Sequence, residues 1–391
     1  MAVTIHNTPQ LFTPSDNPVN WTFSSDMTGE DNFVFIIEVF VNGTLVANEL
    51  VSPDNGIYAR FNAQSFASNA SNSPVIGYGT SYDSNNYSSI RIRIVERYGV
   101  IPIDQATATT TDVIVFKARL EDELFIAWDH TEYLGSTATR WLSNFPDNEI
   151  RNVKDFGEQQ RLMAITNNDS SLTMSIELFN SFGTSIVSET GISTITSTIT
   201  GFNVSPEQIV ASTPITLSQF QNASYYVISM SSDLPDIRIN IDRGIVYDNF
   251  RRIHFLSEIG SIESFTFALI SREGGNIKSF GYRKQFGEWS GSDFIYSNEQ
   301  GRDIDYAKVS MREIVIESDW INQNIQHWIF RNMYESPLVL EEKPLASSPL
   351  STGLFRRSIK NTSWADKYDK NDMLFKEKIT LGLPHKTSMI L

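Results

Sequence analysis

The chain has 391 residues, enough for two or three domains, and its 46 acidic and 31 basic residues give a formal net charge of −15. An acidic chain of this kind lacks the basic stripe that neutralises phosphates, so we expect no binding to nucleic acid or to an anionic membrane. The absence of cysteine excludes disulfides and cysteine metal sites, and it favours folding in a reducing cytoplasm. The first residues lack the basic and apolar regions of a signal peptide, so secretion is not expected.

Alternating apolar and polar residues predict β-strands throughout residues 1–118. The predicted strands are Asn20–Ser24, Phe33–Val41, Ser89–Val95 and Asp112–Ala118. Asn42-Gly43 predicts a hairpin after the second of them, because both residues tolerate positive φ. Short strands separated by turn residues are typical of an immunoglobulin-like or fibronectin-like sandwich, which we expect here. The Asn- and Ser-rich residues 67–89 are expected to form a surface loop.

Residues 119–243 repeat this pattern and predict a second sandwich of the same kind. The predicted strands are Phe125–Trp128, Arg161–Thr166, Leu172–Phe179, Thr194–Phe202, Tyr225–Ser229 and Ile237–Ile241. The two segments share a strand pattern but no legible sequence repeat.

Residues 244–391 predict a small α+β domain with one prominent helix over residues 319–335. Ser318 is placed to be its N-cap, and Pro337 ends it. An apolar stripe recurs at helical spacing, formed by Ile321, Ile325, Trp328, Ile329 and Met333. Before the helix, Gly274-Gly275 predicts a hairpin between Phe265–Ser271 and Ile277–Arg283. After it, an extended connector over residues 341–352 leads to a basic terminal strand pair, Ser358–Trp364 and Leu374–Leu383.

The sequence shows no catalytic or cofactor-binding constellation, so we predict that the protein is not an enzyme and needs no cofactor or metal. Its five histidines are scattered, and Gly274-Gly275 lacks the lysine and hydroxyl residue of a phosphate-binding loop. Two interpretations stay open. Trp128, Trp141, Trp289 and Trp364 have the ring type that stacks on sugars, although tryptophans in sandwiches are more often core or interface anchors. Paired carboxylates for glycan cleavage depend on a separation in space that the sequence does not give.

The C-terminal part resembles a known family of virion proteins. HFLSEIGSIESFTF (residues 254–267), the tryptophan-containing helix that ends in Ser336-Pro337, and KNTSWADKYDKNDMLFKEKITL (residues 360–381) are similar to blocks of tail-associated proteins from phages that infect Bacteroidetes, including crAss-like phages. FVFIIEVFVNGTLVA (residues 33–47) and FNAQSF (residues 61–66) are similar to the first domain of such proteins. Residues 120–243 match least well. The resemblance implies a structural component of a tail or its collar, and it carries over no catalytic residue.

We therefore expect an architectural protein of a tailed-phage virion, made in the bacterial cytoplasm and forming an oligomeric ring, collar or tail element. Its expected partners are further copies of itself and neighbouring tail or portal-proximal proteins. The interface residues expected first are Trp289, Trp364, Arg356, Arg357 and Lys376. The alternatives are a receptor- or glycan-binding tail protein and a glycan-cleaving enzyme.

Overall fold

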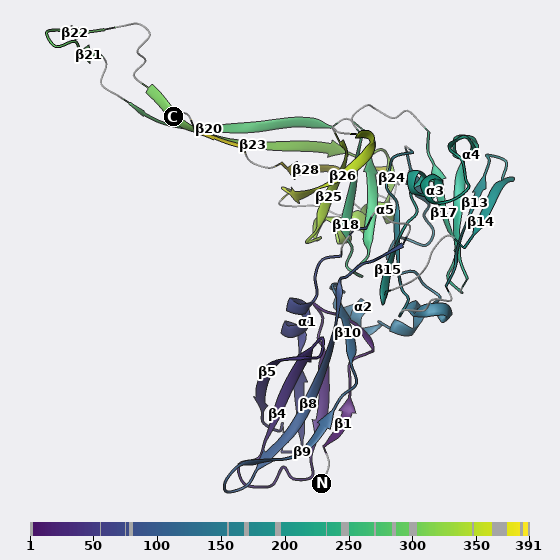
Figure 1. The fold of residues 1–391 in the computed structure, drawn as a ribbon, viewed down its shortest axis with the longest axis vertical. Coiled ribbons are helices and arrows are strands. Elements are labelled where there is room, and N and C mark those ends of the chain that lie inside the picture. Colours follow the sequence, from purple (N-terminus) through teal and green to yellow (C-terminus); the bar gives the residue numbers. More distant parts are fainter. Residues whose placement is uncertain are drawn as a thin grey trace.

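The computed structural model shows a mainly β chain, with 49% strand and 13% helix, as the composition predicts. It describes residues 3–54, 56–74, 76–77, 81–154, 156–167, 172–191, 197–231, 233–243, 250–269, 271–283, 287–296, 303–345, 348–361, 374–383 and 386–389. Figure 1 shows an N-terminal unit at one end of the molecule, a broader group of sheets at the other end, and a ribbon that projects sideways from that group. No helix in the described part of the chain is long and apolar enough to span a bilayer.

The N-terminal unit consists of two sheets that face each other across one core. The first sheet has the order β1-β3-β6, and the second has the order β2-β10-β8-β4-β5 with β9 beside β8. Their strands are β1 (Thr4–Asn7), β2 (Phe12–Pro14), β3 (Asn20–Ser24), β4 (Val34–Val41), β5 (Thr44–Val51), β6 (Tyr58–Asn62), β8 (Tyr87–Tyr98), β9 (Ile103–Thr109) and β10 (Val113–Phe116). Trp21 from one sheet and Ile37 and Ile92 from the other are fully buried together. The predicted hairpin is confirmed, with Asn42 at φ 48° and Gly43 at φ 78° between β4 and β5.

The next part of the chain also packs two sheets over a core. A five-stranded sheet has the order β11-β17-β16-β13-β14, and a three-stranded sheet has the order β12-β15-β7. Their strands are β7 (Ser81–Asp83), β11 (Arg151–Val153), β12 (Arg161–Ile165), β13 (Met174–Phe179), β14 (Ser185–Thr190), β15 (Ile199–Asn203), β16 (Tyr225–Met230) and β17 (Ile237–Ile241). Helices α3 (Pro206–Ser212) and α4 (Leu217–Asn222) add Ile209 and Phe220 to this core. Strand β7 comes from the first third of the chain, so this group is not built from one continuous segment.

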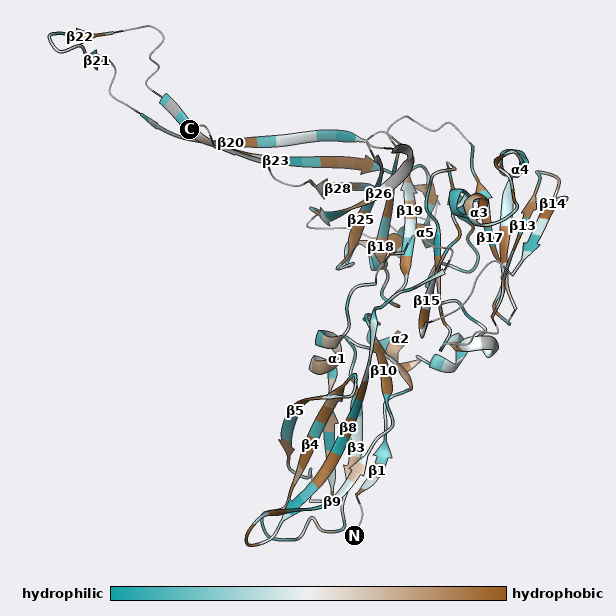
Figure 2. Cartoon of the chain, viewed as in Figure 1, coloured by the Kyte–Doolittle hydropathy of each residue, from teal (hydrophilic) through white to brown (hydrophobic). Residues whose placement is uncertain are grey.

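The C-terminal part is an eight-stranded sheet with a helix packed on it. The strand order is β19-β18-β25-β26-β28-β23-β20, and β29 also pairs with β23. These strands are β18 (Arg251–Leu256), β19 (Ile262–Phe267), β20 (Arg272–Arg283), β23 (Asp303–Glu317), β25 (Val339–Leu345), β26 (Ser348–Ile359), β28 (Lys378–Gly382) and β29 (Lys386–Met389). Two short pairs complete the strands, β21 (Glu288–Trp289) with β22 (Phe294–Ile295) and β24 (Ile321–Asn322) with β27 (Leu374–Phe375). Figure 2 shows hydrophobic stretches along β18 and β25 inside the body and also along β20 and β23 outside it.

A fourth buried cluster joins the three parts. It contains Phe12 and Phe116 from the N-terminal unit, Met163 from β12, and Leu256 and Ile262 from the C-terminal sheet. The short helices α1 (Gln64–Ala70), α2 (Asp122–Ile126), η1 (His130–Tyr133) and η2 (Gly135–Thr137) lie between these parts in sequence. The division at residues 118/119 and 243/244 stays a prediction, and residues 244–249 lie outside the described residues.

The prominent helix is shorter than predicted. It comprises α5 (Gln323–Ile329) and a π-helical turn η3 (Phe330–Tyr334). Asn322 is the N-cap and accepts a hydrogen bond from the Ile325 N–H at 3.0 Å. Ser318, the predicted cap, is buried and instead accepts the Glu377 N–H at 2.8 Å. The helix begins late because Ile321 and Asn322 are taken up by strand pairing with residues 374–375. The predicted apolar stripe is buried along its whole length.

Four other local predictions are wrong. Gly274 and Gly275 lie inside one continuous strand, β20, which pairs with β23 rather than folding back on the strand before it. Residues 125–128 belong to helix α2 and the residues after it, and the expected loop over residues 67–89 contains the end of α1, β7 and the start of β8. The described residues of 341–352 are extended, as predicted, but they belong to the paired strands β25 and β26 and are not a connector. In the terminal pair, Ser358–Ile359 pairs with Leu381–Gly382, and residues 362–373 lie outside the described residues.

Candidate assembly interface

A ribbon built on strands β20 and β23 projects from the C-terminal sheet (Figure 1), and β29 pairs with β23 along residues 307–310 of this ribbon. β20 pairs with β23 from Arg272 opposite Val315 to Arg283 opposite Asp303. All 12 residues of β20 are exposed, and no described strand pairs with its outer edge. At about 3.3 Å per residue, the ribbon is about 40 Å long. We call residues 272–283 and their pairing partners 303–315 the arm.

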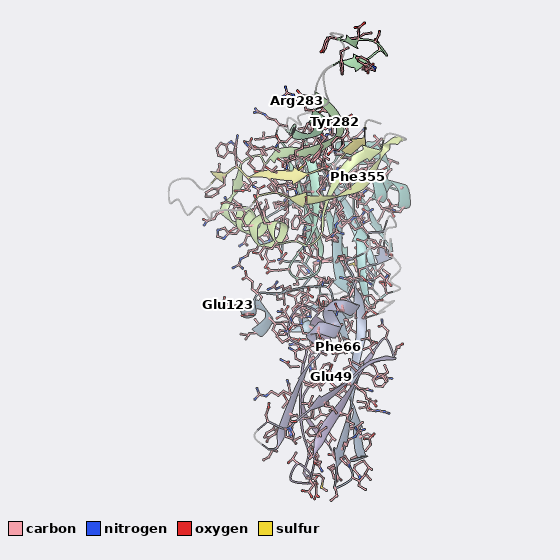
Figure 3. All side chains as sticks on the ribbon, turned by 90° about the vertical axis from the view of Figure 1, so that its left-hand side faces the viewer. Glu49, Phe66, Glu123, Tyr282, Arg283 and Phe355 are labelled. Carbon is pink, nitrogen blue, oxygen red and sulfur yellow. The ribbon has the colours of Figure 1, made fainter. Side chains whose placement is uncertain are left out.

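One face of the arm carries aromatic rings and a cation. Side chains alternate between the two faces of a strand, so Lys278, Phe280 and Tyr282 share a face. A bulge leaves Tyr306 unpaired on β23, and its ring centroid lies 6.5 Å from that of Tyr282. Phe280, Tyr282 and Tyr306 are 45%, 55% and 51% exposed. Figure 3 shows Tyr282 and Arg283 at the end of the molecule remote from the N-terminal unit. We call Lys278, Phe280, Tyr282 and Tyr306 the aromatic face of the arm.

The predicted interface residue Trp289 lies on the short hairpin β21–β22, which comes between β20 and β23 in the chain. Its ring is 62% exposed and lies 5.8 Å from the ring of Phe294. Gly287 and Gly291 adopt φ of 93° and 96°, which an L side chain rarely adopts. This hairpin therefore presents a second aromatic surface outside the body.

The structure does not bring the other predicted interface residues together with Trp289. Arg356 is exposed on β26 and donates to the Pro337 carbonyl at 3.1 Å. The Arg357 guanidinium is buried and pairs with Glu341 at 2.7 Å, so its charge is neutralised inside the fold. Lys376 lies over the Trp320 ring at 4.7 Å, and Trp364 lies outside the described residues.

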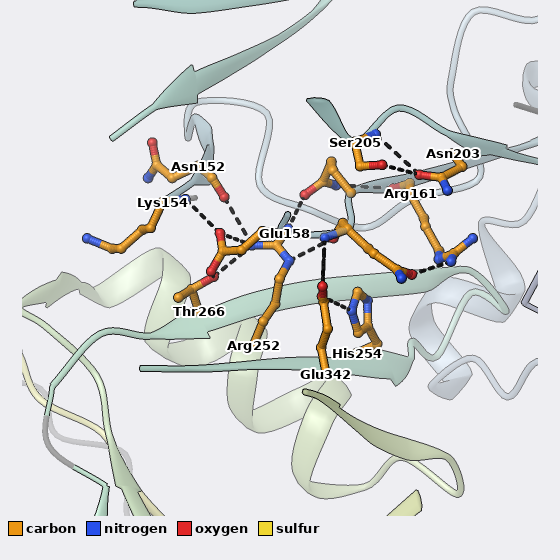
Figure 4. A network of polar contacts seen from close by, with 12 residues as sticks. Asn152, Lys154, Glu158, Arg161, Asn203, Ser205, Arg252, His254, Thr266 and Glu342 are labelled. Carbon is orange, nitrogen blue, oxygen red and sulfur yellow. Dashed lines mark hydrogen bonds and ion pairs between the residues drawn. The ribbon is translucent and has the colours of Figure 1, made fainter. Parts of the chain in front are cut away.

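A buried charge network lies behind the sheet that carries the arm, and sequence reasoning did not predict it (Figure 4). Its centre is Arg252 on β18, which is 2% exposed. The guanidinium donates to the Gln159 carbonyl at 2.7 Å, to Thr266 Oγ1 at 2.7 Å, to Gln160 Oε1 at 2.5 Å and to Glu158 Oε2 at 3.2 Å. Residues 158–160 belong to the chain segment that leads into β12. The network therefore fastens this segment to the C-terminal sheet.

Glu158 is held by more than its ion pair with Arg252. Its carboxylate also accepts the Lys154 N–H at 2.6 Å and the Thr266 hydroxyl at 2.9 Å. A buried charge is tolerated when it is paired and hydrogen-bonded on all sides, as this one is.

A buried histidine–glutamate pair continues the network. His254 Nε2 lies 2.9 Å from Glu342 Oε2, and both Glu342 oxygens accept the Gln159 N–H at 3.2 Å. Burial lowers the pKa of His254, so the ring is neutral near pH 7. Burial opposes ionisation of Glu342, but the hydrogen bond from His254 and the charge of Arg252 hold its pKa below the ordinary value. Both residues are buried, and neither lines the groove beside α2 or the one beside Trp320.

The sequence shows the charged residues of this network, but strand alternation alone does not predict that they are buried. Arg252 and His254 alternate with the apolar Ile253 and Phe255 in a strand that is buried on both faces. Strand alternation alone assigns such charged residues to solvent, because it contains no information about a second layer over that face.

A groove of about 720 Å³ lies beside α2, η1 and the start of β17. Trp128 and Trp141 belong to its lining but are only 6% and 4% exposed. Each indole N–H donates to a backbone carbonyl at 2.9 Å, and Trp128 stacks on Tyr133 with centroids 4.8 Å apart. Both rings are therefore core anchors and do not offer a free face to a sugar.

The groove carries more acidic than basic side chains. Six carboxylates and three guanidiniums line it: Asp129, Glu132, Asp147, Glu149, Asp236, Glu258, Arg140, Arg151 and Arg238. Two of the arginines are already paired, Arg140 with Glu132 at 3.3 Å and Arg151 with the buried Glu263 at 2.5 Å. The apolar Leu124 and Ile150 are each 41% exposed along it. We call this feature the acidic groove.

No protein-family model matches the chain, and a search of curated proteins found no significant match.

Proposed function

We propose that the protein is a structural component of a tailed-phage virion, a ring, collar or tail subunit that assembles with copies of itself and with neighbouring tail or portal-proximal proteins. The observation that carries this proposal is the arm. The paired strands β20 and β23 continue past β28 and past the partner strand β29, and the aromatic side chains near their far end stay exposed in a lone subunit. Contact with a neighbouring subunit buries those rings, and this is the ordinary role of such extensions in assemblies.

The arm also has the chemistry of an interface. Aromatic side chains are enriched at the centres of protein interfaces, and Phe280 and Tyr282 supply two of them on one face, beside the cation Lys278. No strand in the described part of the chain pairs with the outer edge of β20, so its backbone groups can pair with a strand of another chain.

We further propose that the two N-terminal groups of sheets are immunoglobulin-like or fibronectin-like sandwiches. In the first group, two sheets with antiparallel pairing throughout, apart from β2 with β10, share one core. In the second group, strands β13, β14, β16 and β17 form an antiparallel run. Modules of this kind are suited to repetitive contact because their loops and edge strands are exposed.

The proposal places the protein in the virion tail after synthesis in the bacterial cytoplasm, without a catalytic role or a cofactor. A chain without cysteine folds equally well in a reducing cytoplasm and in an exposed particle. The alternative of a glycan-binding tail protein requires an exposed aromatic platform in a concavity. Trp128 and Trp141 do not supply one in the acidic groove, because their ring faces are covered.

The test is the native mass of the purified full chain, with negative-stain imaging, in the presence and absence of virion extract. A closed ring, or incorporation into particles at a fixed symmetric copy number, supports the proposal. A monomer or trimer that ignores the extract and binds host glycan contradicts it.

A further inference from the structure

We propose that the aromatic face of the arm of one copy lies in the acidic groove of the next copy, so that subunits join head to tail. The inference deepens the proposed function, because it rests on self-assembly and names the two surfaces that meet. It commits to a second copy of this chain as the occupant of the groove.

Charge complementarity is the first argument. The arm carries Arg272, Lys278, Arg283, Lys308 and Arg312 against Glu273, Asp303, Asp305 and Glu313, an excess of one positive charge in a chain of net charge −15. Lys278 makes no ion pair with another described residue. Arg283, Lys308 and Arg312 each pair with a carboxylate, and Arg272 lies at the end of the ribbon next to the body. The acidic groove has an excess of three negative charges. Lys278, on the same face as Phe280 and Tyr282, therefore meets the opposite charge in the groove, and complementary fields of this kind steer association and fix its register.

Apolar complementarity is the second argument. The aromatic face offers Phe280 and Tyr282, and the groove offers the half-exposed Leu124 and Ile150 among its lining residues. Recognition surfaces commonly combine apolar with charged side chains in this way. A volume of about 720 Å³ lies within the range that takes up a few large side chains.

The placement of the two surfaces is the third argument. In Figure 1 the arm leaves the body on the left, whereas α2 and β17, whose residues line the groove, lie to the right of the arm's base. The arm of one molecule therefore points away from its own groove. Two different surfaces that meet between copies form a heterologous contact, which closes into a ring when the rotation permits and otherwise grows as a filament.

The decisive experiment uses two variants that each destroy one surface. The arm variant carries Lys278→Glu and Phe280→Asp, and the groove variant carries Asp147→Lys and Asp236→Lys, which replace exposed side chains. We expect each variant alone to self-associate at least tenfold more weakly than the wild type. Mixed in equal amounts, they retain one intact contact, the arm of the groove variant in the groove of the arm variant, so native mass should show dimers and nothing larger.

A control variant, Asp31→Lys with Glu49→Lys, makes the same charge change as the groove variant on exposed positions of the N-terminal unit, and it should assemble like the wild type. Circular dichroism of all variants shows whether each one is folded. Raising the salt concentration should weaken wild-type association, because the contact is partly electrostatic.

The absence of cysteine allows a direct test of proximity. Asn276→Cys, on the same face of the arm as Lys278 and Phe280, and Thr139→Cys beside the groove are made in separate chains, mixed, assembled and treated with a short bismaleimide. A cross-link between the two kinds of chain supports the inference. Links between two arm cysteines, or from the arm to another virion protein, overturn it.

The outcomes separate the two proposals. If the wild type assembles but the mixture gives no dimers and no arm-to-groove cross-link, this inference fails and the proposed function stands. If the wild type assembles neither alone nor with virion extract, the proposed function fails and the inference fails with it.

Discussion

Replacing Arg252 with alanine tests whether the buried charge network fastens residues 158–160 to the sheet that carries the arm. The substitution leaves Glu158, 3% exposed, without its cation, and it removes the donors to Gln160 and Thr266. Breaking a buried ion pair by removing one partner costs about 3–5 kcal/mol, because the remaining charge is stranded in the interior.

The assay is equilibrium urea unfolding followed by tryptophan fluorescence and by circular dichroism, since a chain of several units can lose two-state behaviour. With a denaturant slope of about 3 kcal/mol per molar urea, the expected loss lowers the midpoint by about 1 M or more. The matched control is Arg331→Ala. Arg331 pairs with Glu121 at 3.2 Å, but both side chains are about half exposed, so the expected cost is about 0–1 kcal/mol.

A second variant isolates the stranded charge. Adding Glu158→Gln to the Arg252→Ala chain removes the uncompensated carboxylate, so part of the lost stability should return, giving a non-additive cycle. A midpoint change for Arg252→Ala no larger than that of Arg331→Ala, or strict additivity in the double variant, would refute the account of the network.

Two further predictions concern pH and backbone geometry. The pKa values of His254 and Glu342 are both lowered in the folded state, so the folded protein binds these protons less readily than the unfolded chain does. The free energy of unfolding should therefore fall as pH drops below about 6.5, because of His254, and fall further below about 4.5, because of Glu342. Thermal unfolding between pH 8 and 4 measures this, and a His254→Gln chain with an unchanged profile through the upper step would contradict it. Gly260 adopts φ 86°, and an added Cβ would lie 2.7 Å from a backbone carbonyl oxygen at the junction with the N-terminal unit, so Gly260→Ala should cost more than about 1 kcal/mol. The control Gly29→Ala has open space around the new Cβ and should change the unfolding midpoint little.

The sequence by itself determined the features that depend on neighbouring residues. The alternation of Ile90, Ile92 and Ile94 places them in the core because successive side chains of a strand point to opposite faces. Asn42-Gly43 sets its hairpin because the two residues accept the positive φ that the turn requires. The apolar stripe from Ile325 to Met333 is buried because helical spacing brings it to one side.

The tertiary structure decided whatever depends on partners distant in the chain. Gly274 lies within a long strand because β23, some 40 residues later, pairs with β20 along its whole length. The two glycines and their neighbours in sequence do not reveal this distant partner. The helix begins at Gln323 because Ile321 pairs with Phe375. Arg252 is buried because residues 158–160 and residue 266 converge on it from separate segments of the chain. The arm stands outside the body because β20 and β23 stay paired beyond Glu313, where the pairing of β23 with β28 ends. Local sterics and side-chain periodicity determine turns, strands and helix faces, and both can be read from neighbouring residues. Strand partners and layers depend on which distant segments meet on folding, and neighbouring residues do not specify them.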